Sequence, residues 1–182
     1  MTAYEKLQRN LKRRPRKWLV TGAAGFIGSH LVETLLGLNQ YVVGLDNFST
    51  GYAHNVDTVK QQLTSEQRRR FRFIEGDISD AATCSRACRQ MDYVLHQAAL
   101  GSVPRSFADP LATHLANTTG FIQVLEAAKK SNVSRVVYAS SSSVYGDAKG
   151  LPKCEGIEGT LLSPYAVRTA EDELHARVFH YG

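Results

Sequence analysis

Three glycines spaced three residues apart follow a short apolar run near the start of the chain. The run is Lys17–Thr21, and Gly22, Gly25 and Gly28 separate it from a stretch with helical periodicity. Glycine permits a tight turn at Gly22, lets the backbone approach a ligand at Gly25, and lets the helix pack closely at Gly28. The helix N-terminus presents N–H groups and a positive dipole end to anions. This spacing therefore predicts a turn that binds the pyrophosphate of a dinucleotide.

Two acidic residues at the ends of later apolar runs extend this prediction. Asp46 closes the run Tyr41–Asp46, where a carboxylate can bind the hydroxyls of the adenosine ribose. A carboxylate there repels a 2′-phosphate, so we expect NAD rather than NADP. Asp77 and Ile78 follow the third run and suit the edge of the adenine. The alternative is an α/β protein that binds no nucleotide and carries these glycines by coincidence.

The elements that must position these residues alternate along the chain between strand-like and helix-like patterns. The expected strands are Lys17–Thr21, Tyr41–Asp46, Phe71–Glu75, Asp92–His96 and Arg135–Ser140. The expected helices are Phe26–Asn39, Asn55–Leu63, Ala81–Gln90, Leu111–Ser131 and Pro164–Tyr181, and the dipeptides Asp109-Pro110 and Ser163-Pro164 mark two helix starts. Apolar strands separated by helices predict a parallel sheet, that is, an α/β fold with a Rossmann-like doubly wound sheet of five strands.

Length and composition indicate one globular domain with a basic extension. The chain has 182 residues, of which 43% are hydrophobic and 21% charged. No apolar stretch is long enough for a membrane span or a secretory signal, so we expect a cytoplasmic protein without a membrane partner. The three cysteines and six histidines show no metal-ligand spacing, so no metal is expected.

Basic residues gather at the N-terminus and in one internal cluster. We interpret residues 1–16 as a basic arm and 17–182 as the NAD-binding domain. The arm is suited to contact nucleic acid or an acidic partner, but we expect a solvated helix. The cluster Arg68–Arg70 with Arg72 is interpreted as solvated, and no aromatic interleaving indicates nucleic-acid binding.

Several motifs together resemble the extended short-chain dehydrogenase/reductase family, also called the NAD-dependent epimerase/dehydratase family. They are Thr21–Gly28, Gly44–Gly51, Gly76–Ile78, His96–Ala99, Ser140–Gly146 and Ser163–Tyr165. The stretch Leu100–Ser106 and the arm from Tyr4 onward resemble the branch of bacterial UDP-N-acetylglucosamine 4-epimerases of surface-polysaccharide pathways. The resemblance implies a homodimer through the helices 111–131 and 164–181. It also implies that the later strands and the substrate domain of the family are missing from this chain.

The resemblance assigns roles to individual residues. For NAD it implies Gly22, Gly25, Phe26, Ile27, Gly28, Asp46, Asn47, Ser49, Thr50, Gly51, Asp77, Ile78, Gln97, Ala99 and Tyr165. For the sugar nucleotide it implies Ser102, Ser141 and Ser142. It makes Tyr165 the catalytic tyrosine and Ser141 the hydroxyl that hydrogen-bonds the reacting oxygen, while Asn117 matches a residue that supports the site.

The implied reaction interconverts UDP-N-acetylglucosamine and UDP-N-acetylgalactosamine by reversible hydride transfer at sugar C4. A tyrosine phenol has a pKa of about 10, so a tyrosine acting as base needs positive charge beside it. The family supplies a lysine four residues later, where this chain has Thr169. On a regular helix, Arg168 points about 100° away from the direction of residue 169. Its charge can therefore replace that of the lysine only if the backbone is irregular.

Two alternatives to that activity follow. The first is a UDP-glucose or UDP-glucuronate 4-epimerase. The second is a truncated NAD-binding remnant with weak or no activity, because Thr169 replaces the lysine and the C-terminal half is absent. Family dehydratases carry Asp-Glu where this chain has Ser142-Ser143, which favours epimerisation over dehydration.

Overall fold

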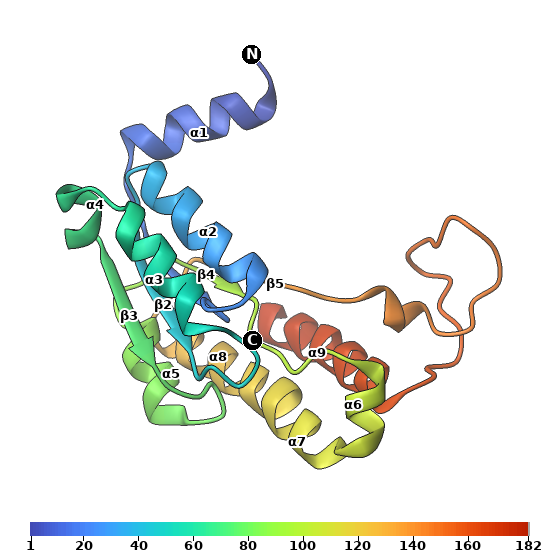
Figure 1. Cartoon of the computed structure of the whole chain (residues 1–182). Helices are drawn as coiled ribbons and strands as arrows, with labels where there is room; N and C mark the ends of the chain where they lie inside the picture. The colour runs from blue at the N-terminus through green and yellow to red at the C-terminus, as the bar shows by residue number, and fades with distance from the viewer. Residues whose placement is uncertain (182) are drawn as a thin grey trace.

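A computed structural model describes residues 1–181 and shows five parallel strands in the order β3-β2-β1-β4-β5 (Figure 1). The strands are β1 (Lys17–Thr21), β2 (Tyr41–Asp46), β3 (Phe71–Glu75), β4 (Tyr93–His96) and β5 (Arg135–Tyr138). The chain winds outward from β1 to β3 and then returns to place β4 on the other side of β1. The predicted Rossmann-like doubly wound sheet is therefore confirmed. Gly182, the last residue of the predicted domain, lies outside the described residues.

Helices cover both faces of the sheet, because successive strand residues point to opposite sides. On one face, α2 (Phe26–Gly37) and α3 (Ala53–Gln62) enclose a cluster that includes Val20 and Val42. On the other face, α5 (Ala81–Cys88) and α8 (Gly120–Lys130) pack on Leu19 and Val43. The two clusters pack the sheet from both sides, so the loops at the strand ends start from fixed positions.

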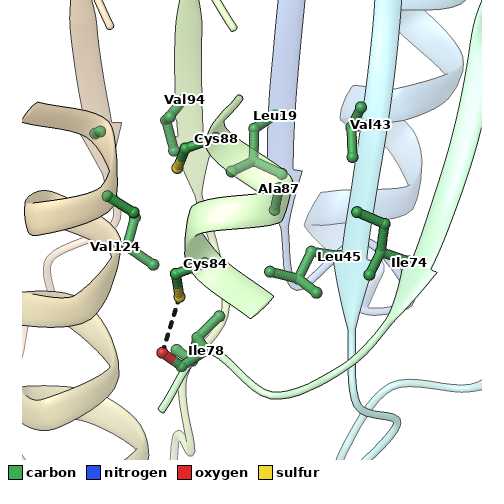
Figure 2. Close-up of a cluster of buried hydrophobic side chains, with 12 residues drawn as sticks. Leu19, Val43, Leu45, Ile74, Ile78, Cys84, Ala87, Cys88, Val94 and Val124 are labelled. Carbon is green, nitrogen blue, oxygen red and sulfur yellow. Dashed lines mark hydrogen bonds between the residues drawn. The ribbon is translucent and has the colours of Figure 1, made fainter. Parts of the chain in front are cut away.

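The core beneath α5 contains both cysteines of that helix (Figure 2). The Cys84 thiol donates a hydrogen bond to the carbonyl of Ile78 at 3.0 Å. Burial raises the pKa of both Cys84 and Cys88 to about 12, so these thiols stay protonated at neutral pH. The two cysteines share one face of α5, as their spacing predicts, and they serve as packing residues.

The long helical pattern predicted for residues 111–131 is broken into three segments. They are α7 (Pro110–His114), the π-helical turn η1 (Leu115–Thr119) and α8. The Asp109 side chain caps α7 by accepting the N–H of Ala112 at 2.9 Å. Ser163 likewise caps α9 (Pro164–Tyr181), since its hydroxyl accepts the N–H of Ala166 at 3.1 Å. Both predicted helix starts are confirmed.

Three short elements have no counterpart in the sequence prediction. They are α4 (Ser65–Arg69), α6 (Val103–Ala108) and the 3₁₀ turn η2 (Ser142–Tyr145). Each is six residues or shorter, and segments of one or two turns carry too little hydrophobic periodicity to be recognised. The strand β5 also ends at Tyr138, two residues before the predicted end, where the Ser140 hydroxyl donates to Glu173 of α9 at 2.5 Å.

The basic arm forms the helix α1 (Ala3–Arg13), which stands apart from the sheet (Figure 1). Its N-terminus has a capping box between Thr2 and Glu5, and none of its residues is buried. The buried side chain of Gln40 holds its end, because it donates to the carbonyl of Leu11 at 2.9 Å and accepts the N–H of Arg16 at 3.0 Å. The arm is thus a helix, and it is anchored at one end only.

Candidate functional site

A hollow of about 80 Å³ lies where the parallel strands end. The loops after β1, β2, β3 and β4 and the turn η1 form its walls. The lining residues are Gly22, Gly25, Leu45, Asp46, Asn47, Ser49, Thr50, Gly51, Gly76, Asp77, Ile78, Gln97, Ala98, Ala99, Leu100 and Ala116. In doubly wound folds, ligands bind at this carboxyl edge where the strand order reverses. The volume suits a ribose or a pyrophosphate, so a larger ligand would extend along the open edge.

The glycine turn after β1 has no room for side chains. Gly22 has a φ of +68°, and a Cβ there would lie 2.7 Å from the backbone nitrogen of Ala98. A Cβ on Gly28 would lie 2.0 Å from the carbonyl oxygen of Gly22. Gly25 is the N-cap of α2 and offers no side-chain cap to the first N–H groups of that helix. The turn therefore fits a group that accepts several backbone hydrogen bonds, such as a pyrophosphate.

Asp46 joins the glycine turn to the loop after β2. Its carboxylate is almost fully buried and accepts the N–H of Ala24 at 2.9 Å and the N–H of Phe48 at 2.7 Å. These bonds hold the two loops together at the wall of the hollow. A carboxylate can accept more than two hydrogen bonds, so Asp46 keeps acceptor capacity while it lines the hollow.

Asp77 forms the next part of the wall. Partial burial acts to raise its pKa, but hydrogen bonds from Ser79 and Asn47 outweigh burial and hold the pKa of Asp77 below its usual value. The amide of Asn47 donates to Asp77 at 2.7 Å. The carboxylate is therefore ionised at neutral pH, and it links the loops after β2 and β3.

The loop after β4 is fixed to β1 through a buried threonine. The Thr21 hydroxyl accepts the N–H groups of Gln97 and Ala98, each at 3.2 Å, and lies 2.8 Å from Nδ1 of His96. Because the hydroxyl already accepts two N–H groups, its own proton points to Nδ1, which must be unprotonated. His96 is therefore neutral, and burial lowers its pKa from 6.5 to about 4.

This buried histidine predicts a loss of stability in acid. Below pH 6.5 the unfolded chain protonates His96, whereas the folded protein excludes that proton until about pH 4. The free energy of unfolding should fall by about 3 kcal/mol across this window and level off below it. Urea unfolding at pH 7 and pH 4 would measure the loss. His96→Asn can still accept from Thr21 but cannot titrate; an equally steep loss in that variant would contradict the assignment.

The residues expected to carry the reaction lie in other segments. Tyr165 is half-buried in the first turn of α9, and α9 packs against η2, which begins directly after Ser141. The Ser141 hydroxyl caps η2 and accepts from the Ser143 hydroxyl at 3.0 Å. None of the residues Ser102, Ser141, Ser142 and Tyr165 lines the hollow. The structure thus brings most of the expected cofactor residues together and keeps these four outside that wall.

Phe26, Ile27 and Gly28 also stand outside the lining, at the start of α2. The side chains of Phe26 and Ile27 are exposed by 79% and 56%. Ser102 caps α6 by accepting the N–H of Arg105 at 3.3 Å.

The position expected to carry a lysine has no positive charge. Thr169 is 6% exposed, and its hydroxyl donates to the carbonyl of Tyr165 at 2.9 Å. Arg168 instead pairs with Glu171, with Nη1 at 2.8 Å from both carboxylate oxygens. Glu171 also accepts from the Thr118 hydroxyl at 3.1 Å. The guanidinium is therefore directed to η1, and α9 is regular, so the condition for compensation by Arg168 is not met.

Asn117 fixes the loop that closes the hollow. Its side-chain oxygen accepts the N–H of Leu100 at 2.7 Å, and its amide donates to the carbonyl of Leu100 at 3.2 Å. Asn117 lies in η1, and a π-helical turn often marks a functional site. Ala116 of the same turn also lines the hollow. It was not predicted as a site residue, because a single alanine within a helical pattern does not indicate a function.

Two other features are absent from residues 1–181. No helix in this range combines the length and the apolar character needed to cross a membrane. In the same range, no group of three or more His, Cys, Asp or Glu side chains is arranged to hold a metal ion.

Comparison with known proteins gives consistent similarities. Residues 18–177 match the model of the NAD dependent epimerase/dehydratase family. A UDP-glucose 4-epimerase from Mycolicibacterium smegmatis is 39% identical over 163 residues, which are 88% of this chain and 50% of that protein. The chain spans about half the length of the curated relatives it matches.

Solved structures agree with this family match. A UDP-N-acetylglucosamine 4-epimerase from Methanobrevibacter ruminantium, in complex with UDP-N-acetylmuramic acid, has a TM-score of 0.82 and 34% identity, covering 92% of this chain and 51% of that chain. A dTDP-glucose 4,6-dehydratase from Streptomyces venezuelae with bound NAD has a TM-score of 0.81 and 35% identity, covering 91% and 52%.

Proposed function

Because the chain belongs to the NAD dependent epimerase/dehydratase family, we propose that it binds NAD at the carboxyl edge of its sheet and contributes the cofactor half of a nucleotide-sugar 4-epimerase. The observation that carries this proposal is the side-chain-free turn of Gly22, Gly25 and Gly28, which leads into an uncapped helix N-terminus. A Cβ at Gly28 would overlap the Gly22 carbonyl, so this close approach of helix and turn requires glycine. We call the turn from Gly22 to Gly28 the cradle. The cradle fits a pyrophosphate.

We assign the remaining cofactor contacts around this cradle. We assign Asp46 to the adenosine ribose, and Asp77 and Ile78 to the adenine. The loop residues Asn47, Ser49, Thr50 and Gly51, together with Gln97 and Ala99, complete the cleft. The exposed side chains of Phe26 and Ile27 would be covered by the bound dinucleotide. A buried carboxylate at position 46 supports NAD over NADP, since a 2′-phosphate would be repelled.

Bound NAD supplies a hydride acceptor and donor for sugar C4. In the proposed reaction, Tyr165 holds and returns the proton of the 4-hydroxyl, and Ser141 hydrogen-bonds the same oxygen. Ser102 and Ser142 are assigned to the sugar nucleotide. Ser142-Ser143 offers no carboxyl group to remove water from the sugar, which supports epimerisation rather than the dehydration named for the Streptomyces venezuelae neighbour.

The substrate class we propose is a UDP-hexose. The motifs resemble those of UDP-N-acetylglucosamine 4-epimerases, and one structural neighbour has that name. The curated relatives are named mainly as UDP-glucose 4-epimerases, so UDP-glucose is the alternative substrate. A second candidate function, NAD binding with weak or no turnover, is favoured by Thr169, which stands where the family has a lysine.

Two measurements on the chain test these proposals. Calorimetric titration with NAD should give saturable one-to-one binding, and NADP should bind more weakly. Incubation with UDP-N-acetylglucosamine, and separately with UDP-glucose, followed by chromatography, should reveal the galacto epimer of the true substrate. Absence of NAD binding would overturn the proposed function. NAD binding without an epimer would select the inactive alternative.

We also propose that two copies pair through residues 111–131, which form most of α7 together with η1 and α8, and through α9, as the family resemblance implies. Large exposed apolar side chains occur on α6, α7, η1 and α9. They are Phe107, Leu111, Leu115, Leu174 and Val178, each more than half exposed. Exposed apolar side chains on neighbouring helices are typical of an interface. Sedimentation of the chain at several concentrations would detect the dimer.

A further inference from the structure

A second hollow lies at the opposite end of the sheet, where the strands begin, and cations surround it. Its volume is about 330 Å³. The lining residues are Lys17, Tyr41, Val42, Val43, Arg69, Arg70, Phe71, Arg72, Arg86, Arg89, Gln90 and Met91. The six basic side chains come from the start of β1, from α4 and the start of β3, and from the end of α5. Figure 1 shows α4 at this end of the sheet, near the base of α1. We call this hollow the basic groove.

The groove exists because α5 is short and β3 carries an arginine at a core-facing position. Alternation along β3 places Arg72 on the face opposite to Phe71 and Phe73, which pack with the α2 side of the sheet. Arg72 therefore lies on the α5 side, where an apolar residue would extend the core. The helix α5 has eight residues and ends at Cys88, so it does not cover the start of β3.

The cations of the groove divide into anchored and free ones. Arg70 pairs with Glu66 at 2.7 Å, donates to the carbonyl of Asn39 at 2.5 Å, and lies 5.4 Å from the ring centre of Tyr41. It therefore braces the wall. Within residues 1–181, the guanidinium groups of Arg69, Arg72 and Arg89 make no hydrogen bond and no ion pair with the protein.

The negative ends of neighbouring helices do not neutralise the positive charge of the groove. The C-termini of α4 and α5 point toward the groove, and a helix end carries roughly half a negative charge at most. Glu66 and Asp92, whose carboxylate accepts the backbone N–H of Lys17 at 2.8 Å, add two more negative charges, whereas six cations line the groove. The protein thus holds several like charges around one concave surface without enough counter-charge. Such an arrangement repels itself and attracts anions.

We propose that the basic groove binds a small anion with two or three adjacent phosphates. The volume is within the range of small-molecule pockets. Three free guanidinium groups match several phosphate oxygens, since each offers a planar set of donors. The cations enclose a hollow rather than follow a stripe, which disfavours a long nucleic acid. The ligand is either an inorganic polyphosphate or the phosphate tail of a nucleotide. This site is independent of the proposed NAD site, which lies at the other end of the strands.

Calorimetry with sodium tripolyphosphate on the whole chain tests the groove. The triple variant Arg69→Gln, Arg72→Gln, Arg89→Gln should weaken binding at least about tenfold, because it removes the three unpartnered guanidinium groups. A matched control, Lys6→Gln, Arg9→Gln, Lys12→Gln, removes the same charge from the exposed side of α1 and should weaken it less than about threefold. Binding should also weaken as sodium chloride rises.

Three further measurements make the outcome decisive. Saturating NAD should leave tripolyphosphate binding within about twofold, and the thermal unfolding of both triple variants should match that of the parent chain. UTP binding more tightly than tripolyphosphate would identify a nucleotide as the source, and equal affinity would identify a free polyphosphate. Equal losses in the two triple variants, displacement by NAD, or no binding of tripolyphosphate would overturn the proposal. Failure of NAD binding alone would affect only the proposed function.

Discussion

Replacing Gly28 by alanine is expected to lower the affinity for NAD at least about 100-fold and to destabilise the folded chain. The added Cβ would lie 2.0 Å from the Gly22 carbonyl oxygen and 2.7 Å from its carbonyl carbon. Both are backbone atoms of the turn, so no flexible side chain can move aside. Either α2 moves away from β1 or the turn changes its path, and both changes misplace the N–H groups proposed to hold the pyrophosphate.

The stability cost should be that of an overpacked core, about 1–3 kcal/mol. For a chain of this size, that corresponds to a fall in melting temperature of roughly 5 °C. Calorimetry with NAD and thermal unfolding by circular dichroism give the two quantities. Gly37→Ala is the matched control in the same helix, because a Cβ there meets nothing within 4 Å. It should leave NAD affinity unchanged and raise stability slightly.

An unchanged NAD affinity in the Gly28→Ala variant would refute the proposed cradle. Comparable losses in both glycine variants would show instead that α2 is sensitive to any substitution. The comparison therefore separates a specific close approach from general helix instability.

The sheet could be predicted because its strands are short apolar runs that end at polar loops. Three strands, β1, β2 and β3, have the bounds that the sequence predicts. The interruption of the long helix at η1 could not be predicted, because hydrophobic periodicity hardly changes across one π-helical turn. That turn coincides with a tertiary contact, the two hydrogen bonds between Asn117 and the backbone of Leu100.

The hollow at the carboxyl edge of the sheet, where we propose that NAD binds, was predictable for a similar reason. Its expected residues sit directly after strands, and parallel strands bring those positions to one edge. The basic groove was not predictable, since its cations come from three distant segments. Arg72 was interpreted from the sequence as part of a solvated cluster, and only the packing of α5 against the sheet places Arg86 and Arg89 beside it. These arginines meet because α5 ends early and because alternation along β3 turns Arg72 toward the same side. No short stretch of sequence shows both conditions.

At position 169 the sequence shows a threonine where the family has a lysine. The contacts of the neighbouring Arg168 side chain could not be predicted from the sequence. The structure pairs Arg168 with Glu171 through two charge-assisted hydrogen bonds, and Glu171 also accepts from Thr118 of η1. With Thr169 bonded to the carbonyl of Tyr165 and Arg168 paired with Glu171, the position four residues after that tyrosine has no cation.

Thr169→Lys is therefore expected to raise the rate of 4-epimerisation by at least about tenfold. The ammonium group would stand one helical turn from Tyr165, where it favours the ionised phenol needed for proton removal. The gain should be larger at pH 7 than at pH 9.5, because a phenol ionises more readily without help in base. The assay follows UDP-hexose epimers by chromatography, in this chain and in the same chain continued with the second half of its Mycolicibacterium smegmatis relative.

The substitution should also carry a stability cost in the absence of ligand. Thr169 is 6% exposed, and an unpaired ammonium at a buried position destabilises the folded state. NAD should reverse part of that cost, since a ligand that binds the folded form raises its stability. Thr169→Met is the matched control, because it fills similar space without charge. If the methionine variant gains as much activity as the lysine variant, packing rather than charge limits the reaction, and the argument from the missing lysine fails.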